Sequence, residues 1–460
     1  MTTPQPGGRI PAAARPILVL TFVNALGGTL LIPVLPFVVR DLGYGDLVYA
    51  LLIAAYPAAQ FFAAPILGGY ADHRGRRPVL LVSQAGTLLS WFLFAGAYFV
   101  DADGVALSLI VASRVVDGLT GGNQSVASAY LADVVEGPDR TRVFSAQGAI
   151  AGVALLVGPT LGSYSAALSI GFLGTALVAI AISTATLVLL TTLRESLSDD
   201  LRAPSFDANP LHQLNLIGNA RSLTGADTLI RLFAVGGLFN VTIGAYGTIV
   251  VLWYVDGLGI SESTTGLMFL ATGTFLIFNE TVSLRAFQSR LGDTGTLMAG
   301  LLLVPFALVV LAVPSSVPPF LAALFFLNLG FALIIPTLQS VVTRAADEHE
   351  EGVAQGINTS VGAMASALAP IGAGVVYAAG GGRASFITAA VVAAMAAALG
   401  LASRSAIRRS VGETDPQTDD HGHGPVHSLV SVISGSGRHH GLRLQGGHLL
   451  HHNVKRSDAT

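Results

Sequence analysis

Long apolar runs alternate with short polar segments along the chain as far as residue 402. Each run has about 20 residues or slightly more, the length that an α-helix needs to cross the hydrocarbon core of a bilayer. The pattern predicts an all-α, polytopic membrane protein with twelve transmembrane helices. They fall near residues 17–38, 48–68, 79–100, 105–132, 143–165, 168–192, 232–254, 264–284, 295–313, 319–341, 353–377 and 384–402.

The twelve runs form two sets of six. The spacing from Phe144 to Pro159 in the fifth run equals that from Gln355 to Pro370 in the eleventh, which indicates an internal repeat. Repeated six-helix halves place a binding site at their interface, near the membrane midplane. The predicted divisions are a cytoplasmic N-terminus 1–16, a six-helix bundle 17–192, a cytoplasmic linker 193–231, a second bundle 232–403 and a polar cytoplasmic tail 404–460.

Composition supports the membrane assignment. Hydrophobic residues make up 52% of the 460 residues and charged residues 11%, whereas soluble proteins carry about a quarter charged residues. The net charge of −3 gives no indication of nucleic-acid binding, and the absence of cysteine excludes disulfides and thiolate metal sites. We expect no cofactor and no metal. Eight of the eleven histidines lie in the glycine-rich tail, and a disordered tail is favoured there over a metal site.

Arginine positions predict the orientation. Seventeen arginines fall in the segments that are cytoplasmic if the N-terminus is inside, counted up to Arg409. The opposite loops contain only Arg40 and Arg383. Because positively charged loops stay on the cytoplasmic side, both termini are predicted to lie inside.

A short polar turn follows the second run, from Gly68 to Leu80. Glycines at 68 and 75 permit close helix approach and a sharp reversal, while Asp72 can pair with one of the neighbouring guanidinium groups or with the positive end of a neighbouring helix. The spacing Gly-x-x-x-Asp-x-x-Gly-Arg-Arg-x-x-Leu resembles the loop between helices 2 and 3 of the major facilitator superfamily of transporters.

The stretch from Ser125 to Arg142 is similar to the end of helix 4 in drug/proton and tetracycline/proton antiporters of that superfamily. That resemblance implies a cytoplasmic charge cluster of Asp72, Arg76 and Asp133. Such a cluster acts as a conformational latch if its pairs form in one state and break in another. The expected latch comprises Gly68, Asp72, Gly75, Arg76, Arg77 and Asp133.

The fourth run contains two charges, Arg114 and Asp117, which lie three residues apart on one helix face. Charges inside a membrane are costly and indicate function, although a purely structural pair is the alternative. Arg114 resembles the helix-4 arginine that the superfamily associates with proton coupling. We therefore expect Arg114 and Asp117 to take part in coupling. Glu280, in the eighth run, is a third candidate, unless its side chain only reaches toward water.

The fifth run contains a glycine and proline pattern that resembles the Gly-Pro-x-x-Gly-Gly motif of helix 5 in antiporters, which separates exporters from importers. Its members here are Gly148, Gly152, Gly158, Pro159 and Gly162. Ser163 replaces the last glycine of the motif and Ala154 an earlier one, and both are small. Such residues let helices bend or pack closely.

Polar residues within the runs are candidates for the substrate cavity. Asn24 stands where the tetracycline exporters have an aspartate, so a proton carrier must lie elsewhere, because asparagine does not take up protons near neutral pH. Intramembrane amides often only bond to neighbouring helices, which is the alternative for each candidate. The candidates are Asn24, Gln124, Asn240, Tyr246, Asn328 and Asn358.

These features favour a multi-pass cell-membrane transporter that moves a small amphipathic or hydrophobic molecule by alternating access, most plausibly in drug/proton antiport. Its expected partners are a small-molecule substrate, protons and the lipid bilayer, and we expect a monomer. Proton-coupled uptake and a non-transporting sensor are the alternatives. An enzyme is not expected, because no Walker loop, His-Glu-x-x-His or Gly-x-Ser-x-Gly motif is present.

Overall fold

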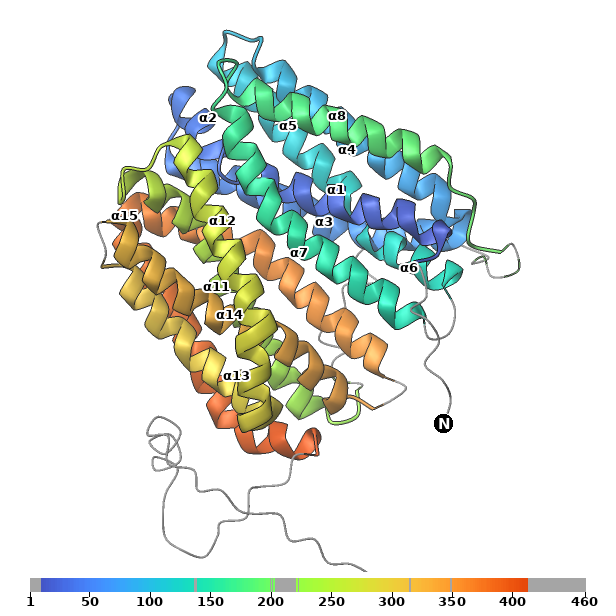
Figure 1. The fold of residues 1–460 in the computed structure, drawn as a ribbon, viewed down its shortest axis with the longest axis vertical. Helices are drawn as coiled ribbons and strands as arrows, with labels where there is room; N and C mark the ends of the chain where they lie inside the picture. The colour runs from blue at the N-terminus through green and yellow to red at the C-terminus, as the bar shows by residue number, and fades with distance from the viewer. Residues whose placement is uncertain are drawn as a thin grey trace, which may run out of the picture. The chain divides into compact units, whose positions relative to one another are not determined.

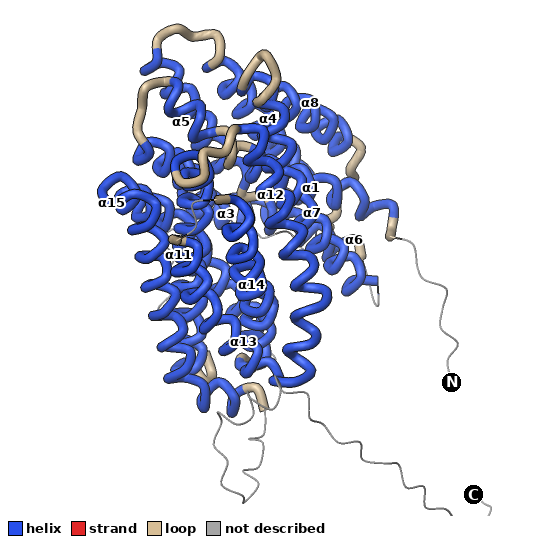
Figure 2. Tube along the Cα trace, turned by 60° about the vertical axis from the view of Figure 1, so that its left-hand side comes forward, coloured by secondary structure: helices blue, strands red, loops and turns tan. Residues whose placement is uncertain are grey.

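The computed structural model describes residues 10–412, except 136–138, 199, 201, 203–220, 222, 314–315 and 348–349. Every regular element within these residues is helical, and no strand occurs among them (Figure 2). The predicted all-α fold is therefore confirmed. The histidine-rich tail and most of the predicted linker lie outside the described residues.

The first half of the chain contains eight long or medium helices after a short 3₁₀ turn, Ala12–Ala14. Two of the predicted spans are each broken into two helices. These helices are α1 (Arg15–Leu30), α2 (Leu35–Asp41), α3 (Asp46–Arg74), α4 (Arg76–Ala97), α5 (Asp103–Gly121), α6 (Gln124–Val134), α7 (Asp139–Ala166) and α8 (Phe172–Thr191).

The breaks have local causes. Pro33 lies between α1 and α2, and proline has no backbone N–H to continue the helical ladder. Gly122 and Asn123 separate α5 from α6, and both residues are poor helix formers. The sequence pattern did not predict either break, because apolar periodicity continues across both.

The second half contains longer helical segments, two of which, α13 and α15, are interrupted at a glycine. α11 begins six residues before the predicted start of its span, and α15 continues seven residues beyond the predicted end at 403. The elements are α11 (Ala226–Asp256), α12 (Glu262–Phe278), the π-helical turn η3 (Asn279–Ser283), α13 (Leu284–Leu311), α14 (Val317–Ala345) and α15 (Glu351–Ser410).

Among the described residues, ten helical segments are long and apolar enough to cross a membrane. Two of them, Ser263–Leu311 and Val353–Ser410, have 49 and 58 residues, about twice what one crossing requires. Gly292 and Gly381 interrupt these two segments with φ values of 66° and 71°, a conformation that glycine adopts most readily. Two crossings in each would give twelve, and this number and the orientation stay predictions.

The helices of each half pack mainly with one another. α1 packs on α7 and α4 on α5 in the first half, while α11 packs on α15 and α13 on α14 in the second. In Figure 1 the blue-to-green helices α1 to α8 gather on one side and the yellow-to-red helices on the other. Two pairs make most of the contact between the halves, α3 with α15 and α7 with α12.

Small residues make these contacts close. A Cβ added at Gly374 of α15 would overlap the side chain of Ala50 in α3. On the other junction, a Cβ at Gly266 of α12 would lie 2.9 Å from the Cβ of Ser163 in α7, and Thr160 donates a hydrogen bond of 3.2 Å to the Gly266 carbonyl. Glycine therefore allows near-backbone contact between the two halves.

The glycines expected to form the helix-5 motif divide into two groups along α7. A Cβ added at Gly158 would overlap Thr29, and one at Gly162 would overlap the carbonyl oxygen of Leu30, both in or next to α1. Nothing lies within 4 Å of a Cβ placed at Gly148 or Gly152. The packing with α1 therefore depends on the second group alone.

We predict opposite effects for alanine at the two ends of α7. Gly162→Ala forces α1 and α7 apart and should lower the free energy of unfolding by about 1–3 kcal/mol. Gly148→Ala occupies open space in a helix and should be neutral or stabilising by up to about 1 kcal/mol. Thermal unfolding of the purified protein in detergent measures both, and a lower melting temperature for Gly148→Ala than for Gly162→Ala would contradict the packing assignment.

Candidate functional site

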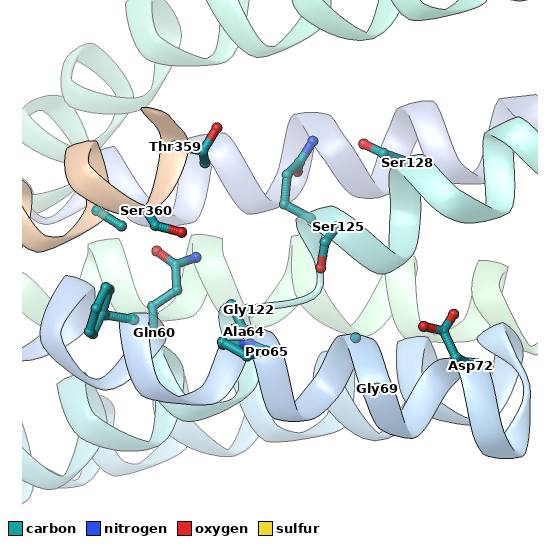
Figure 3. A pocket seen from close by; sticks show the side chains of 14 residues that line it. Gln60, Ala64, Pro65, Gly69, Asp72, Gly122, Ser125, Ser128, Thr359 and Ser360 are labelled. Carbon is teal, nitrogen blue, oxygen red and sulfur yellow. The ribbon is translucent and has the colours of Figure 1, made fainter. Parts of the chain in front are cut away.

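A cavity of about 670 Å³ lies between the two halves of the molecule. Figure 3 shows side chains from α3 and α6 of the first half and from α15 of the second half around it. Its volume falls within the range of small-molecule sites in proteins. The lining residues are Gln60, Phe61, Ala64, Pro65, Gly68, Gly69, Asp72, Gly122, Gln124, Ser125, Ser128, Thr359, Ser360 and Ala363.

The lining combines apolar surface with amides and hydroxyls. Gln60 and Gln124 supply amides, while four serines and threonines supply hydroxyls. Asp72 is the one charged residue among those that line the cavity, and it contributes a carboxylate. The site thus offers many neutral hydrogen-bonding groups and a negative charge at one end.

The cavity extends along α3 toward its C-terminal end. Gln60 and Asp72 both line it and lie twelve residues apart on this helix, a separation of about 18 Å at 1.5 Å per residue. Figure 3 shows this spread, with Asp72 far from Gln60 along the ribbon of α3. The side chain of Asp72 is 55% exposed, so the cavity reaches solvent-accessible surface at this end.

A charge cluster joins the halves at the opposite end of α3. Arg40, at the end of α2, contacts Asp46 at 2.8 Å and both carboxylate oxygens of Asp256 at 2.9 Å. The Tyr377 hydroxyl donates a 2.7 Å hydrogen bond to Asp256. Bidentate arginine–carboxylate pairs are among the stronger polar contacts. This cluster of Arg40, Asp46, Asp256 and Tyr377 ties α2 and α3 to α11 and α15, and we term it the end clamp.

The two charges of the predicted fourth span form a buried ion pair. Arg114 and Asp117 lie 3.5 Å apart on α5, and each residue is less than 5% exposed. The Arg114 guanidinium also lies 5.5 Å from the ring centre of Trp91. The Ser90 hydroxyl of α4 donates to the Thr87 carbonyl at 2.7 Å, and Thr87 lines the small pocket next to Asp117. Burial of such a pair is costly unless hydrogen bonds complete it.

The pair lies close to the cavity but does not line it. A small polar pocket of about 10 Å³ next to Asp117 is also lined by Asn24, Tyr56, Thr87 and Gly121. Gln60, which lines the large cavity, donates to the Gly121 carbonyl at 2.9 Å and to the Tyr56 hydroxyl at 3.4 Å. Side chains of α3 therefore separate the buried carboxylate from the cavity.

The predicted cavity residues occupy different environments. Gln124 lines the cavity, and Asn24 lines the small pocket next to Asp117. Asn240 and Asn328 donate to carbonyl oxygens of their own helices at 2.8 Å. Tyr246 is buried and packs against Phe331 at 5.7 Å between ring centres.

The remaining predicted site residues lie apart from the cavity lining. Asn358 places its Oδ1 beside Gly236 of α11, although its neighbours Thr359 and Ser360 line the cavity. Glu280 is exposed in the π-helical turn η3, whose neighbours are α12, α13 and α14. The structure does not bring Glu280 to the cavity lining or to the small pocket.

The residues of the expected latch come together at the C-terminal end of α3. Arg76, at the start of α4, pairs with Asp72 near the end of α3, and its Nε lies 3.5 Å from Asp133 at the end of α6. Arg77 donates to the Thr191 carbonyl at 3.1 Å. Gly68 lines the cavity, where a Cβ would lie 3.8 Å from Ser125.

A glutamate from the start of the linker completes this cluster. Glu195 accepts hydrogen bonds from the backbone N–H groups of Arg76 at 2.8 Å and Arg77 at 3.1 Å, at the N-terminus of α4. A carboxylate there satisfies free N–H groups and complements the helix dipole. Gly75 has φ 107°, and a Cβ at this position would overlap the Glu195 carboxylate. The positive φ therefore favours glycine, and any larger residue here would also displace the Glu195 carboxylate.

The second half has a related pair with reversed charges. Asp293 follows Gly292, which has a positive φ like Gly75, and its carboxylate pairs with Arg344 near the end of α14. In the first half, the basic residue Arg76 follows the glycine. The repeat thus keeps the glycine turn and an ion pair while exchanging the sign of the partners.

A sequence model of the Major Facilitator Superfamily matches residues 17–370 and, in a second match, residues 232–437. The chain belongs to this superfamily. The predicted resemblance is therefore confirmed.

Relatives include tetracycline resistance proteins. The class C protein of Escherichia coli is 28% identical over 373 residues, covering 79% of this chain and 89% of that protein. The class G protein of Vibrio anguillarum is 30% identical over 372 residues, with coverage of 79% and 90%. Major facilitator superfamily domain-containing protein 10 of Mus musculus is 26% identical over 432 residues, with coverage of 84% and 92%.

Solved structures show the same fold. The human organic anion transporter MFSD10 (TETRAN) aligns with a TM-score of 0.65 and 22% identity, covering 85% of this chain and all of that one. A bacterial homolog of the human lysosomal transporter Spinster, in an inward-facing and occupied conformation, aligns with a TM-score of 0.67 and 12% identity, covering 86% and 97%. At these identities the likeness concerns the fold alone.

Sequence reasoning about this superfamily member missed two features. Arg40 could have been noticed, because it is one of two arginines in the loops predicted to lie outside. Its partner Asp256 is 216 residues away, and Tyr377, which donates to Asp256, is 337 residues away, so no local pattern indicates them. Glu195 lies in a stretch read only as linker, and nothing in its spacing indicates the helix that it caps.

We predict that Arg40 holds the clamped end of the transporter closed. Ser163→Cys supplies a buried reporter at the α7–α12 junction in a chain without other cysteines. Adding Arg40→Ala should raise its labelling rate by an impermeant maleimide about threefold to tenfold, because the clamp is partly exposed. Arg383→Ala, at an exposed arginine of the other predicted outer loop, is the control. Equal rates in the Arg40→Ala and control proteins would contradict the prediction.

We also predict that Gly75 and Glu195 are energetically coupled. Glu195→Ala should cost about 0.5–2 kcal/mol, because the N-terminus of α4 loses its cap. Gly75→Ala should destabilise more in the native background than in the Glu195→Ala background, because the steric overlap is then absent. Thermal unfolding of the two single variants and the double variant gives the coupling. If the effects of the two single variants on the free energy of unfolding simply add in the double variant, the contact between Gly75 and Glu195 contributes no energy.

Proposed function

We propose that this chain is a proton-coupled secondary transporter that exports a small amphipathic organic molecule by alternating access. The observation that carries the proposal is the cavity between the two halves, which reaches the surface at Asp72 while the end clamp joins the halves at the other end. A site open to one side at a time is what alternating access requires.

In the predicted orientation, the end clamp faces the outside and the cavity opens toward the cytoplasm. The described conformation then corresponds to an inward-facing state ready to take up a cytoplasmic solute. Export requires the clamp to break and the cytoplasmic ends of the two halves to approach. Asp72 and Arg76 lie at that cytoplasmic end, where they can make new contacts when it closes.

The charge of the cavity supports a neutral or cationic solute. Its lining includes the Asp72 carboxylate, with which Arg76 pairs from outside the lining, but no arginine or lysine. The lining therefore offers no cationic group that would attract an anion. The names of the tetracycline resistance proteins support export of a drug-like molecule. The MFSD10 structure is described as an organic anion transporter, and the cavity lining here does not favour an anion.

Asp117 is the proposed proton carrier. Ionised Asp117 pairs with Arg114 at 3.5 Å, whereas protonation removes the negative charge and leaves the arginine unpaired inside the membrane. An unpaired buried charge is strongly unfavourable, so protonation must change the contacts around α5. Glu280 is the alternative carrier, although its exposed position offers no such partner exchange.

Proteoliposomes with an imposed pH gradient test the function, with tetracycline and ethidium as probes. We predict that the native protein accumulates at least one probe against its gradient and that Asp117→Asn reduces this accumulation at least about tenfold, as expected for loss of an essential proton site. Glu280→Gln should leave accumulation within about twofold of the native rate.

A control variant and two contrary outcomes complete this transport experiment. Asp103→Asn, at the exposed start of α5, controls for a general effect of removing a carboxylate from this helix. Loss of accumulation in Glu280→Gln but not in Asp117→Asn would move the proton site to η3. If no gradient drives either probe in the native protein, the export proposal is wrong and an uptake or sensor role takes its place.

A further inference from the structure

The span that carries the ion pair is broken next to the cavity. α5 ends at Gly121 and α6 begins at Gln124, and the intervening Gly122 and Asn123 have ψ values of 15° and 0° instead of about −42°. A helix end leaves carbonyl groups without partners inside the helix. Other side chains or a ligand must supply those partners within a membrane.

Two side chains from other helices bond at this break. Gln60 of α3 donates from Nε2 to the Gly121 carbonyl at 2.9 Å, and Asn24 of α1 donates from Nδ2 to Oδ1 of Asn123 at 2.7 Å. Asn123 is fully buried, yet its own Nδ2 has no hydrogen-bond partner in the described part of the chain. The break is thus held by side chains but is incompletely satisfied, so a rearrangement can improve its bonding.

The break separates the two functional regions. After it, Gln124, Ser125 and Ser128 of α6 line the large cavity. Before it, Asp117 lies about one helical turn from Gly121, and both line the small pocket of about 10 Å³, which is close to the space of one water molecule. Gln60 therefore contacts the cavity and the break at once.

Packing transmits movement across this region. A Cβ at Gly118 would overlap the Tyr56 carbonyl oxygen, and one at Gly122 would lie 2.9 Å from the Cα of Ala64. The backbones of α3 and α5 are therefore in near contact on both sides of Gln60. A shift of the break changes the position of α3 relative to the Asp117 pocket.

We propose that Gln60 is a positioning residue that couples occupancy of the cavity to the protonation state of Asp117 through the break at Gly121–Asn123. A solute that binds the Gln60 amide withdraws its hydrogen bond from the Gly121 carbonyl, and the break then repacks around the small pocket. The break at Gly121–Asn123 thus has two arrangements, one with Gln60 bonded to the break and one with Gln60 bonded to the solute. Solute binding in the cavity and protonation of Asp117 each shift the equilibrium between these arrangements. The inference rests on the proposed export function.

The ionisable groups that face Asp117 are few. Arg114 lies on the same helix and Tyr56 on α3. Neutral groups complete the surroundings, namely Asn24 on α1 and Thr87 and Ser90 on α4. Gln60 itself carries no charge, so replacing it leaves the charges around Asp117 unchanged. An altered titration of Asp117 in a Gln60 variant must therefore come from positioning.

A ligand-free titration tests the first part of the inference. The infrared C=O band of protonated Asp117 is assigned in the full-length protein by its loss in Asp117→Asn and then followed against pH. Gln60→Leu should move the midpoint by at least about 0.5 pH unit, because the contact that positions the pocket is gone. Gln84→Leu is the matched control, since Gln84 is buried in the same half and donates at 3.1 Å to the Ser183 carbonyl. Equal midpoints in the native and Gln60→Leu proteins would overturn the inference.

A transport assay distinguishes failure of the coupling role of Gln60 from failure of the proposed export function. In proteoliposomes, the ratio of pH-driven accumulation to downhill movement of tetracycline or ethidium should fall at least about tenfold in Gln60→Leu, because loss of coupling affects accumulation more than movement down the gradient. A parallel loss of both activities indicates a structural role and overturns the coupling. An Asp117 band that never titrates, or a native protein that accumulates neither probe, overturns the proposed function itself.

Discussion

The membrane's lack of water is the constraint on which this structure depends. Backbone groups in hydrocarbon must find partners within the protein, and charges must lie at the ends of helices or pair with one another. The chain meets the first demand with long helices and the second by collecting its charges at the two ends of the halves. The Arg114–Asp117 pair on α5 lies away from those ends and satisfies the second demand only by pairing, and the break in the fourth span interrupts the long helices that satisfy the first. Both lie within one or two helical turns of each other, and the proposed coupling is placed in that region.

The contacts between the two halves combine small residues with polar bonds. At the clamped end, glycines bring α3 against α15 and α7 against α12, and the end clamp adds directional polar bonds. Away from that end the helices diverge around the cavity. Small residues provide contact surface without interlocking side chains, so the halves can pivot at these junctions without extensive repacking. The polar bonds supply the preference for one state, because they exist only when the ends meet.

Sequence reasoning succeeded where the physics is local. Helix length, the glycine turn at residue 75 and the i, i+3 spacing of Arg114 and Asp117 follow from residue order alone. It failed where the partner comes from a distant segment. Examples are Glu195, which caps the N-terminus of α4, and Asp256, which pairs with Arg40. The amides at 240 and 328 illustrate a further limit, because a polar residue in an apolar run looks the same whether it faces a cavity or bonds its own helix. Breaks in the first and fourth spans were also missed, since hydropathy does not register a two-residue turn.

The contact between Gly75 and Glu195 has an evolutionary consequence. The turn tolerates no side chain partly because a carboxylate from a segment 120 residues later occupies the space beside it. The freedom of position 75 to vary therefore depends on the residue at position 195. Where an ancestor or homologue lacks the acidic residue, the steric part of the restriction disappears and only the backbone preference for glycine remains. The two positions should then covary across related sequences, which links the familiar turn to a segment otherwise regarded as a mere connector.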